Sequence, residues 1–326
     1  MNTRQLNLLN IGLILISTIV AFIIPFELFL FSYAVLGPLH YLTEISWLHK
    51  RNYFIKGKYD YLWLVVLGIF STLGYFKFAS MMKIGSIAPY VAFMSALVFY
   101  LIKHPYLKAL AILLIVFTSS MFDNSTFYMI FFLVFLPTLI HVFFFTGTFM
   151  LHGAIKSKSA TGKWSVFIFA LCAISFFIYS PISNGYTATD YIRGAYHDFA
   201  ALNFFFINVF QLDQLARFDN TAITTIFSSE TGFKVMRFIA FAYTYHYLNW
   251  FSKTSIIKWH EMDKKYLIAT IFIWVASVAI YRYDYILGLK FLYLLSLLHV
   301  FLEFPLNFKT IIDLGKEAKN FRLARN

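Results

Sequence analysis

The sequence predicts an all-α protein, a polytopic bundle of about ten transmembrane helices, and three observations support this fold class. Apolar residues make up 60% of the 326 residues and charged residues only 13%, about half the share found in an ordinary soluble domain. The mean hydropathy is +0.70. The apolar residues fall in long runs, several near the roughly 20 residues that a helix needs to cross a bilayer. These features exclude a soluble globular enzyme and a disordered chain.

Ten stretches qualify as spans, and we expect eight to ten of them to cross the membrane. They cover about residues 8–24, 26–48, 61–76, 84–102, 105–122, 127–152, 164–180, 233–251, 266–281 and 286–308. The first begins after Arg4 and has no small-residue cleavage site, so it is predicted to be a helix rather than a signal peptide. The whole chain, 1–326, is therefore expected to form a single transmembrane domain.

The basic residues predict the orientation. If both termini lie in the cytoplasm, most of the 27 Lys and Arg residues fall on the cytoplasmic side, and the alternation holds through all ten spans. The net charge of +12 is thus mainly a topology signal. Nucleic acid is not an expected partner, whereas the lipid bilayer is, in a bacterial or archaeal inner (cytoplasmic) membrane.

The one long connection, 181–232, falls outside the membrane in this topology. Its apolar run at 200–212 suggests a cap with one or two interfacial helices, although a plain connecting loop fits equally well. The single cysteine, Cys172, excludes a disulfide framework and a thiolate metal cluster.

The nine histidines fall into two groups according to their predicted depth in the membrane. Five are expected to be solvated or interfacial, at cytoplasmic helix ends or in the outer loop: His49, His104, His152, His260 and His197. Four lie inside spans that run from the outside inward: His40, His141, His246 and His299. Each is about 13 to 14 residues from the outer start of its span, which is about 20 Å of helix. Four histidines at one depth on four parallel helices can converge on one point.

Two of these histidines are followed by a carboxylate four residues later, Glu44 after His40 and Glu303 after His299. Residues at this spacing share a helix face. Ionisable groups at membrane depth are costly and indicate function. We therefore predict that the four histidines bind a metal ion, with the carboxylates holding imidazole tautomers in the catalytic site. Imidazole suits Fe(II), Zn or Cu. Proton or ion translocation and purely structural polar contacts are the alternatives.

Four segments resemble motifs of the Brp/Blh family, the integral membrane β-carotene 15,15′-dioxygenases. They are Gly37-Pro38-Leu39-His40-Tyr41-Leu42-Thr43-Glu44, Leu139-Ile140-His141-Val142-Phe143, Ala242-Tyr243-Thr244-Tyr245-His246, and Leu297-Leu298-His299 with Glu303. Their order and spacing agree from about residue 26 to 309. This chain differs in that Phe145 and Thr146 stand where the family has an acid after its second histidine. Trp250 replaces a further histidine, and Glu replaces Asp at both retained acids.

The resemblance implies a helical membrane fold and an Fe(II)-dependent dioxygenase that cleaves a carotenoid or other polyene to an aldehyde such as retinal. The substrate would be apolar and membrane-soluble, either a carotenoid or a lipid. Four aromatic residues are candidates to line its path: Phe143, Phe144, Trp250 and Phe301. Two other functions stay open, a lipid hydroxylase or desaturase with two irons, and a proton- or ion-coupled transporter or channel.

Overall fold

The structure is a computed structural model that describes residues 2–122, 125–179, 186–258 and 263–323. All regular secondary structure in these four ranges is helical, as the sequence predicts. His260 lies outside the described residues.

Seven helices or helical runs in the described part of the chain are long and apolar enough to cross a membrane. They are α1 (Thr3–Ile23), the run from α2 to α3 (Pro25–His49), α5 (Met82–Leu101), the run from α7 to α8 (Thr126–Lys156), α9 (Ala160–Ile178), α15 (Lys264–Tyr283) and α16 (Tyr285–Leu323). The chain therefore has the character of an integral membrane protein.

The other three predicted spans are also helical, but they differ from these seven. The helices α4 (Asp60–Tyr75) and α6 (Pro105–Phe122) are apolar but shorter. The helix α13 (Glu230–Ser252) is long enough, yet its tyrosines, polar residues and charges lower its hydropathy. The full count of ten membrane spans, their orientation and the single transmembrane domain stay predictions.

The chain divides into two compact units. The first comprises Met1–His40, Val142–His260 and Ile271–Leu289, and the second comprises Tyr41–His141, Glu261–Thr270 and Lys290–Asn326. The chain thus passes from the first unit to the second within α3, directly after His40. It returns within a later helix, directly after His141.

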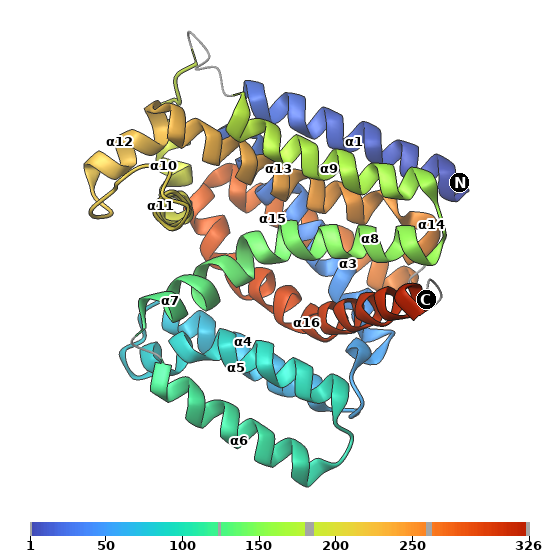
Figure 1. The fold of residues 1–326 in the computed structure, drawn as a ribbon. Coiled ribbons are helices and arrows are strands. Elements are labelled where there is room, and N and C mark those ends of the chain that lie inside the picture. The colour runs from blue at the N-terminus through green and yellow to red at the C-terminus, as the bar shows by residue number, and fades with distance from the viewer. Residues whose placement is uncertain (1, 123–124, 180–185, 259–262, 324–326) are drawn as a thin grey trace. The chain divides into compact units, whose positions relative to one another are not determined.

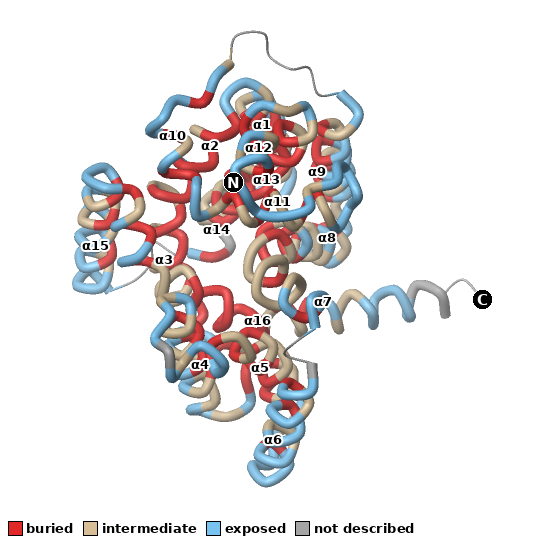
Figure 2. Tube along the Cα trace, turned by 90° about the vertical axis from the view of Figure 1, so that its left-hand side faces the viewer, coloured by how far each residue is buried: buried red, intermediate tan, exposed pale blue. Residues whose placement is uncertain are grey.

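In the first unit, α13 is the central helix (Figure 1). It packs against α1, α2 and α9, and Figure 2 shows it buried along most of its length. Two of its polar side chains have hydrogen-bond partners inside the unit. The hydroxyl of Tyr245 donates to Asn10 of α1 over 3.1 Å, and Thr244 shares a hydrogen bond of 2.8 Å with Ser32. A helix that carries polar groups on all sides is stable here because neighbouring helices supply their partners.

In the second unit, α4 packs along α5, and α5 packs against α6. Glycines allow the closest approach, since a Cβ added at Gly74 would lie 2.7 Å from the Cα of Gly85 on the facing helix. At the opposite end of α4, Lys108 of α6 forms a partly buried ion pair with Asp60. The far side of α6 is exposed, as Figure 2 shows, which suits a helix that faces lipid.

Two helices that carry predicted metal ligands contain π-helical segments. One is η1 (Ser32–Leu36), between α2 (Pro25–Phe31) and α3 (Gly37–His49). The other is η4 (Met129–Phe145), between α7 (Thr126–Tyr128) and α8 (Thr146–Lys156). Pro38 follows the first segment and Pro137 lies inside the second, and each lacks the N–H that an α-helix needs. The indole of Trp274 donates to the carbonyl of Val35 over 2.8 Å and so satisfies one acceptor of η1.

The predicted outer segment 181–232 forms short helices over its described part. They are α10 (Asp190–Tyr196), η5 (His197–Phe199), α11 (Ala200–Val209) and α12 (Asn220–Ser228). The apolar run at 200–212 is thus largely helical. Both α11 and α12 pack on α13, and Tyr196 contacts Phe26 of α2 edge to face. The position of these helices at a membrane interface stays a prediction.

Candidate metal centre

The four histidines predicted inside the membrane are all buried. The exposed fractions are 1% for His40 on α3, 1% for His141 on η4, 7% for His246 on α13 and 3% for His299 on α16. They fall into two pairs, one within each unit of the chain.

The first pair is His40 and His246, whose Nε2 atoms lie 3.1 Å apart. On the far side of the His246 ring, Nδ1 lies 2.8 Å from the hydroxyl oxygen of Thr146. Trp250 meets the ring of His40 edge to face, with centroids 5.3 Å apart, and Tyr247 lies against both imidazoles. The aromatic rings restrict both imidazoles and keep bulk water away from the nitrogen pair.

The second pair is His141 and His299, whose Nε2 atoms also lie 3.1 Å apart. Here Nδ1 of His141 lies 2.9 Å from a carboxylate oxygen of Glu303. Tyr41 stacks on the ring of His299, with centroids 4.2 Å apart. Glu303 thus lies beside an imidazole on another helix rather than the one a turn earlier on its own. Its role in holding an imidazole stays a prediction.

A partner at Nδ1 can orient an imidazole toward a metal ion. A carboxylate 2.9 Å from Nδ1 of His141 favours a proton on that nitrogen, which leaves the lone pair of Nε2 for a metal ion. The hydroxyl of Thr146 can hold His246 in the same tautomer. A ligating histidine in proteins is held in this way by a partner at its other nitrogen.

The spacing between the paired nitrogens matches a shared ion. Two nitrogens that each lie about 2.1 Å from one metal ion are about 3.0 Å apart at a right angle and about 3.4 Å apart at the tetrahedral angle. The observed 3.1 Å in both pairs falls within these limits. A single N–H···N hydrogen bond has the same length, so metal content has to decide between the two.

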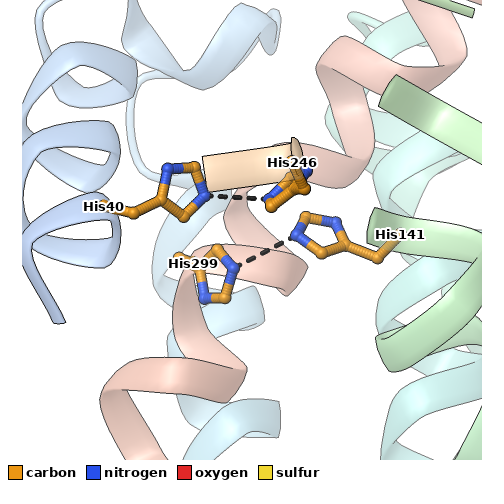
Figure 3. Close-up of side chains that lie close together, drawn as sticks. All are labelled: His40, His141, His246 and His299. Atoms are coloured by element: carbon orange, nitrogen blue, oxygen red, sulfur yellow. Dashed lines mark hydrogen bonds between the residues drawn. The ribbon is translucent and has the colours of Figure 1, made fainter. Parts of the chain in front are cut away.

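The four histidines together form one group in which each offers one nitrogen, and these nitrogens all lie within 4.8 Å of one another. Figure 3 shows the four side chains, with dashed lines that join His40 to His246 and His141 to His299. Four buried imidazoles in this arrangement could hold a metal ion, as the sequence predicts. The residue types do not identify the ion.

Both predicted carboxylates are buried in the second unit. Glu44 follows His40 along α3 and lies close enough to Glu303 for their charges to interact. Their catalytic role stays a prediction.

The four candidate lining residues occupy different surroundings. Trp250 lies beside His40, as described above. Phe143 packs against Phe169 and Phe238, and Phe301 is fully buried and stacks on Phe304. Phe144 is 53% exposed and so faces away from the buried part of its helix. Their role as the lining of a substrate path stays a prediction.

The remaining described histidines lie outside this group, as expected. His49 pairs through Nδ1 with the hydroxyl of Tyr53 over 3.2 Å. Burial, followed by the neighbouring Tyr61, raises the pKa of Tyr53 to about 12, so the phenol stays protonated at neutral pH. His197 forms an exposed contact of 3.4 Å with Asp198.

Sequence reasoning missed two neighbours of the histidines as contacts. Thr146 lies beside His246, and Tyr41 stacks on His299. Thr146 drew notice only as a replacement for an acid. Its position five residues after His141 gives no indication that it contacts His246, which lies 100 residues away in the chain.

Fold and site together define an all-α, membrane-type protein with a buried four-histidine group that could hold a metal ion. Comparison with protein-family models, with curated proteins and with solved structures found no match to this chain. The resemblance to the Brp/Blh family therefore depends on the sequence motifs alone.

Proposed function

We propose that this protein is a membrane-embedded non-haem metal oxygenase, in which His40, His141, His246 and His299 hold one Fe(II) ion. The substrate would be a carotenoid or another polyene, cleaved oxidatively to an aldehyde such as retinal. The observation that carries the proposal is the burial of four imidazoles whose ligand nitrogens lie within 4.8 Å of one another.

The charges near the histidines support a divalent ion. Glu44 and Glu303 are both buried, and an uncompensated buried carboxylate costs several kcal/mol. Four neutral imidazoles bring no charge. A divalent cation among them would favour the ionised form of both carboxylates and balance their two charges.

Side chains around the four ligands would keep the site in one geometry. Glu303 orients His141, Thr146 orients His246, and Tyr41 restrains the ring of His299 by stacking. Trp250 and Tyr247 limit access of water to His40. Such fixed ligands match the way enzymes orient imidazoles for catalysis.

An Fe(II) ion held by neutral imidazoles would supply the electrons that activate O₂ beside an electron-rich double bond. The protein would contribute an apolar environment, since substrate pockets are mostly apolar with few placed polar groups. The 41 phenylalanines and 22 tyrosines of the chain would supply aromatic side chains to line such a pocket. The motif resemblance supports a polyene as the substrate.

Metal analysis tests the site. Protein purified from iron-supplemented cells is expected to contain about one iron per chain, and the variants His40→Ala and His299→Ala are expected to lose most of it. His197→Ala, at an exposed histidine, is the matched control and should retain the metal. Absence of metal from the parent protein, or full retention in both buried variants, would overturn the assignment.

Expression in cells that produce β-carotene tests the substrate. We expect the pigment to fade and retinal to accumulate, and we expect neither change with His299→Ala. If the pigment persists in cells whose protein contains iron, β-carotene is not the substrate.

A further inference from the structure

Asn307 is a buried polar side chain, outside the histidine group, in which both hydrogen-bonding atoms lack a partner among the described residues. Asn307 on α16 is 0% exposed. Among the residues that the structure describes, neither its amide oxygen nor its amide nitrogen has a hydrogen-bond partner. Buried amides in folded proteins are nearly always satisfied, so an unsatisfied one requires an explanation.

The position of Asn307 connects it to the metal site. His299, Glu303 and Asn307 follow one another at intervals of four residues, which makes each the neighbour of the next along one side of α16. Eight residues correspond to about 12 Å along the helix axis. Asn307 is therefore about 12 Å from His299, toward the C-terminal end of the apolar part of α16.

Aromatic residues lie close to Asn307 along α16. Phe304, three residues earlier, and Phe308, the next residue, both pack against Phe93 of α5, with ring centroids 5.1 and 4.6 Å away. An amide among aromatic rings can donate two hydrogen bonds and accept two. This combination of one polar group and apolar walls is typical of a site that orients an apolar ligand by its single polar end.

We propose that Asn307 binds an oxygen at one end of the substrate, so that the substrate is an apolar chain with a terminal hydroxyl or carbonyl group. This inference rests on the proposed apolar substrate of the histidine site. The polar end lies at Asn307, and the chain extends along α16 for about 12 Å to the histidines. A substrate held at that end presents a fixed position along its chain for reaction.

A second buried asparagine, Asn203, serves as a control that distinguishes ligand binding from ordinary packing. Asn203 is also 0% exposed, but it accepts a hydrogen bond of 2.6 Å from Tyr196 and contacts the sulfur of Met236 at 3.8 Å. Its amide serves the fold of the first unit. Asn203→Leu is therefore the matched control for Asn307→Leu.

The test measures binding rather than turnover. β-Carotene and its singly hydroxylated derivative are titrated into purified, metal-containing protein in detergent, and binding is followed by the shift of polyene absorbance. We expect the hydroxylated polyene to bind about tenfold more tightly than β-carotene, the value of one well-placed hydrogen bond. Asn307→Leu should abolish this preference, whereas Asn203→Leu should leave the ratio of the two affinities unchanged.

Two results would overturn the inference: equal binding of both polyenes by the parent protein, or an unchanged preference in Asn307→Leu. If Asn307→Leu does not fold, Asn307→Thr keeps a smaller hydrogen-bonding group and should lower the preference without abolishing it. An unchanged preference in that variant would also count against the proposal. Iron content is measured on the same samples, which separates this inference from the proposed function. Protein that lacks iron but prefers the hydroxylated polyene would contradict the proposed oxygenase. The same result would leave the role of Asn307 intact.

Discussion

At the scale of single residues, two of the four imidazoles have a polar neighbour at the nitrogen that faces away from the group. His141 and His246 have their Nδ1 atoms within 2.9 Å of Glu303 and Thr146, respectively. Loss of such a partner in metalloproteins typically weakens metal binding by about 10- to 100-fold. Two substitutions test whether the same holds here.

Glu303→Gln is expected to weaken iron binding by about tenfold or more. The amide is a weaker hydrogen-bond acceptor for Nδ1 of His141, and the substitution removes a negative charge that would balance the charge of the metal ion. Competition with a chelator measures the affinity. Glu230→Gln, at an exposed carboxylate that pairs with Lys234, is the control. Equal affinities of Glu303→Gln and the parent protein would show that this carboxylate does not support a metal ligand.

Thr146→Val is expected to lower the metal affinity, since the hydroxyl that holds His246 is replaced by a methyl group of similar size. Thr146→Ser keeps the hydroxyl and should restore most of the affinity. The same competition assay applies to both variants. If the valine and serine variants bind metal alike, the hydroxyl has no part in orienting His246.

At the scale of helices, close packing and burial decide which substitutions the protein tolerates. In the second unit, α4 and α5 approach closely at Gly74 and Gly85. In the first unit, α13 is buried along most of its length and ends at Ser252, which Lys253 follows as the C-cap.

Gly74→Ala is expected to destabilise the protein by about 1–3 kcal/mol, because the new methyl group would lie 2.7 Å from the Cα of Gly85. A lower Tm in detergent, recorded by tryptophan fluorescence, would show this. The control is Gly12→Ala on α1, where nothing lies within 4 Å of the added Cβ and helix propensity favours alanine. The prediction fails if both variants melt at the same temperature as the parent.

Lys253 predicts a pH dependence of stability. Burial lowers the pKa of its ammonium group from 10.5 to about 8. The unfolded state therefore binds more protons between these values, and the cost of the buried charge disappears as the pH rises from about 8 toward 10.5. Lys253→Gln should raise the Tm at pH 7, and its advantage should shrink as the pH approaches about 9.5. A constant difference between the two proteins across this range would contradict a depressed pKa.

At the scale of the whole molecule, the four candidate ligands come from four separate helical segments, α3, η4, α13 and α16. The ligands are far apart in sequence, at residues 40, 141, 246 and 299. A metal ion bound by all four would therefore stabilise the folded chain against unfolding in proportion to its affinity.

Removal of the metal is accordingly expected to lower the Tm of the parent protein by several degrees, corresponding to about 2.7 kcal/mol when the free ion is at a hundred times its Kd. Melting with and without a membrane-permeable chelator measures the effect. His299→Ala should melt at the lower temperature under both conditions. A chelator that strips the iron without changing the Tm would show that the ion does not join the four ligands.

The helices, and the histidines inside them, could be predicted from the sequence because both follow from local properties. Apolar runs and their lengths predict helices at all ten positions, and counting along those runs predicts one depth for His40, His141, His246 and His299, whose ligand nitrogens lie within 4.8 Å of one another. The contacts between side chains could not be predicted in this way. Glu303 contacts His141 rather than the histidine on its own helix, and Thr146 contacts His246. Such contacts depend on how helices rotate and pack. The π-helical segments η1 and η4 change that rotation, and no short-range pattern in the sequence encodes it.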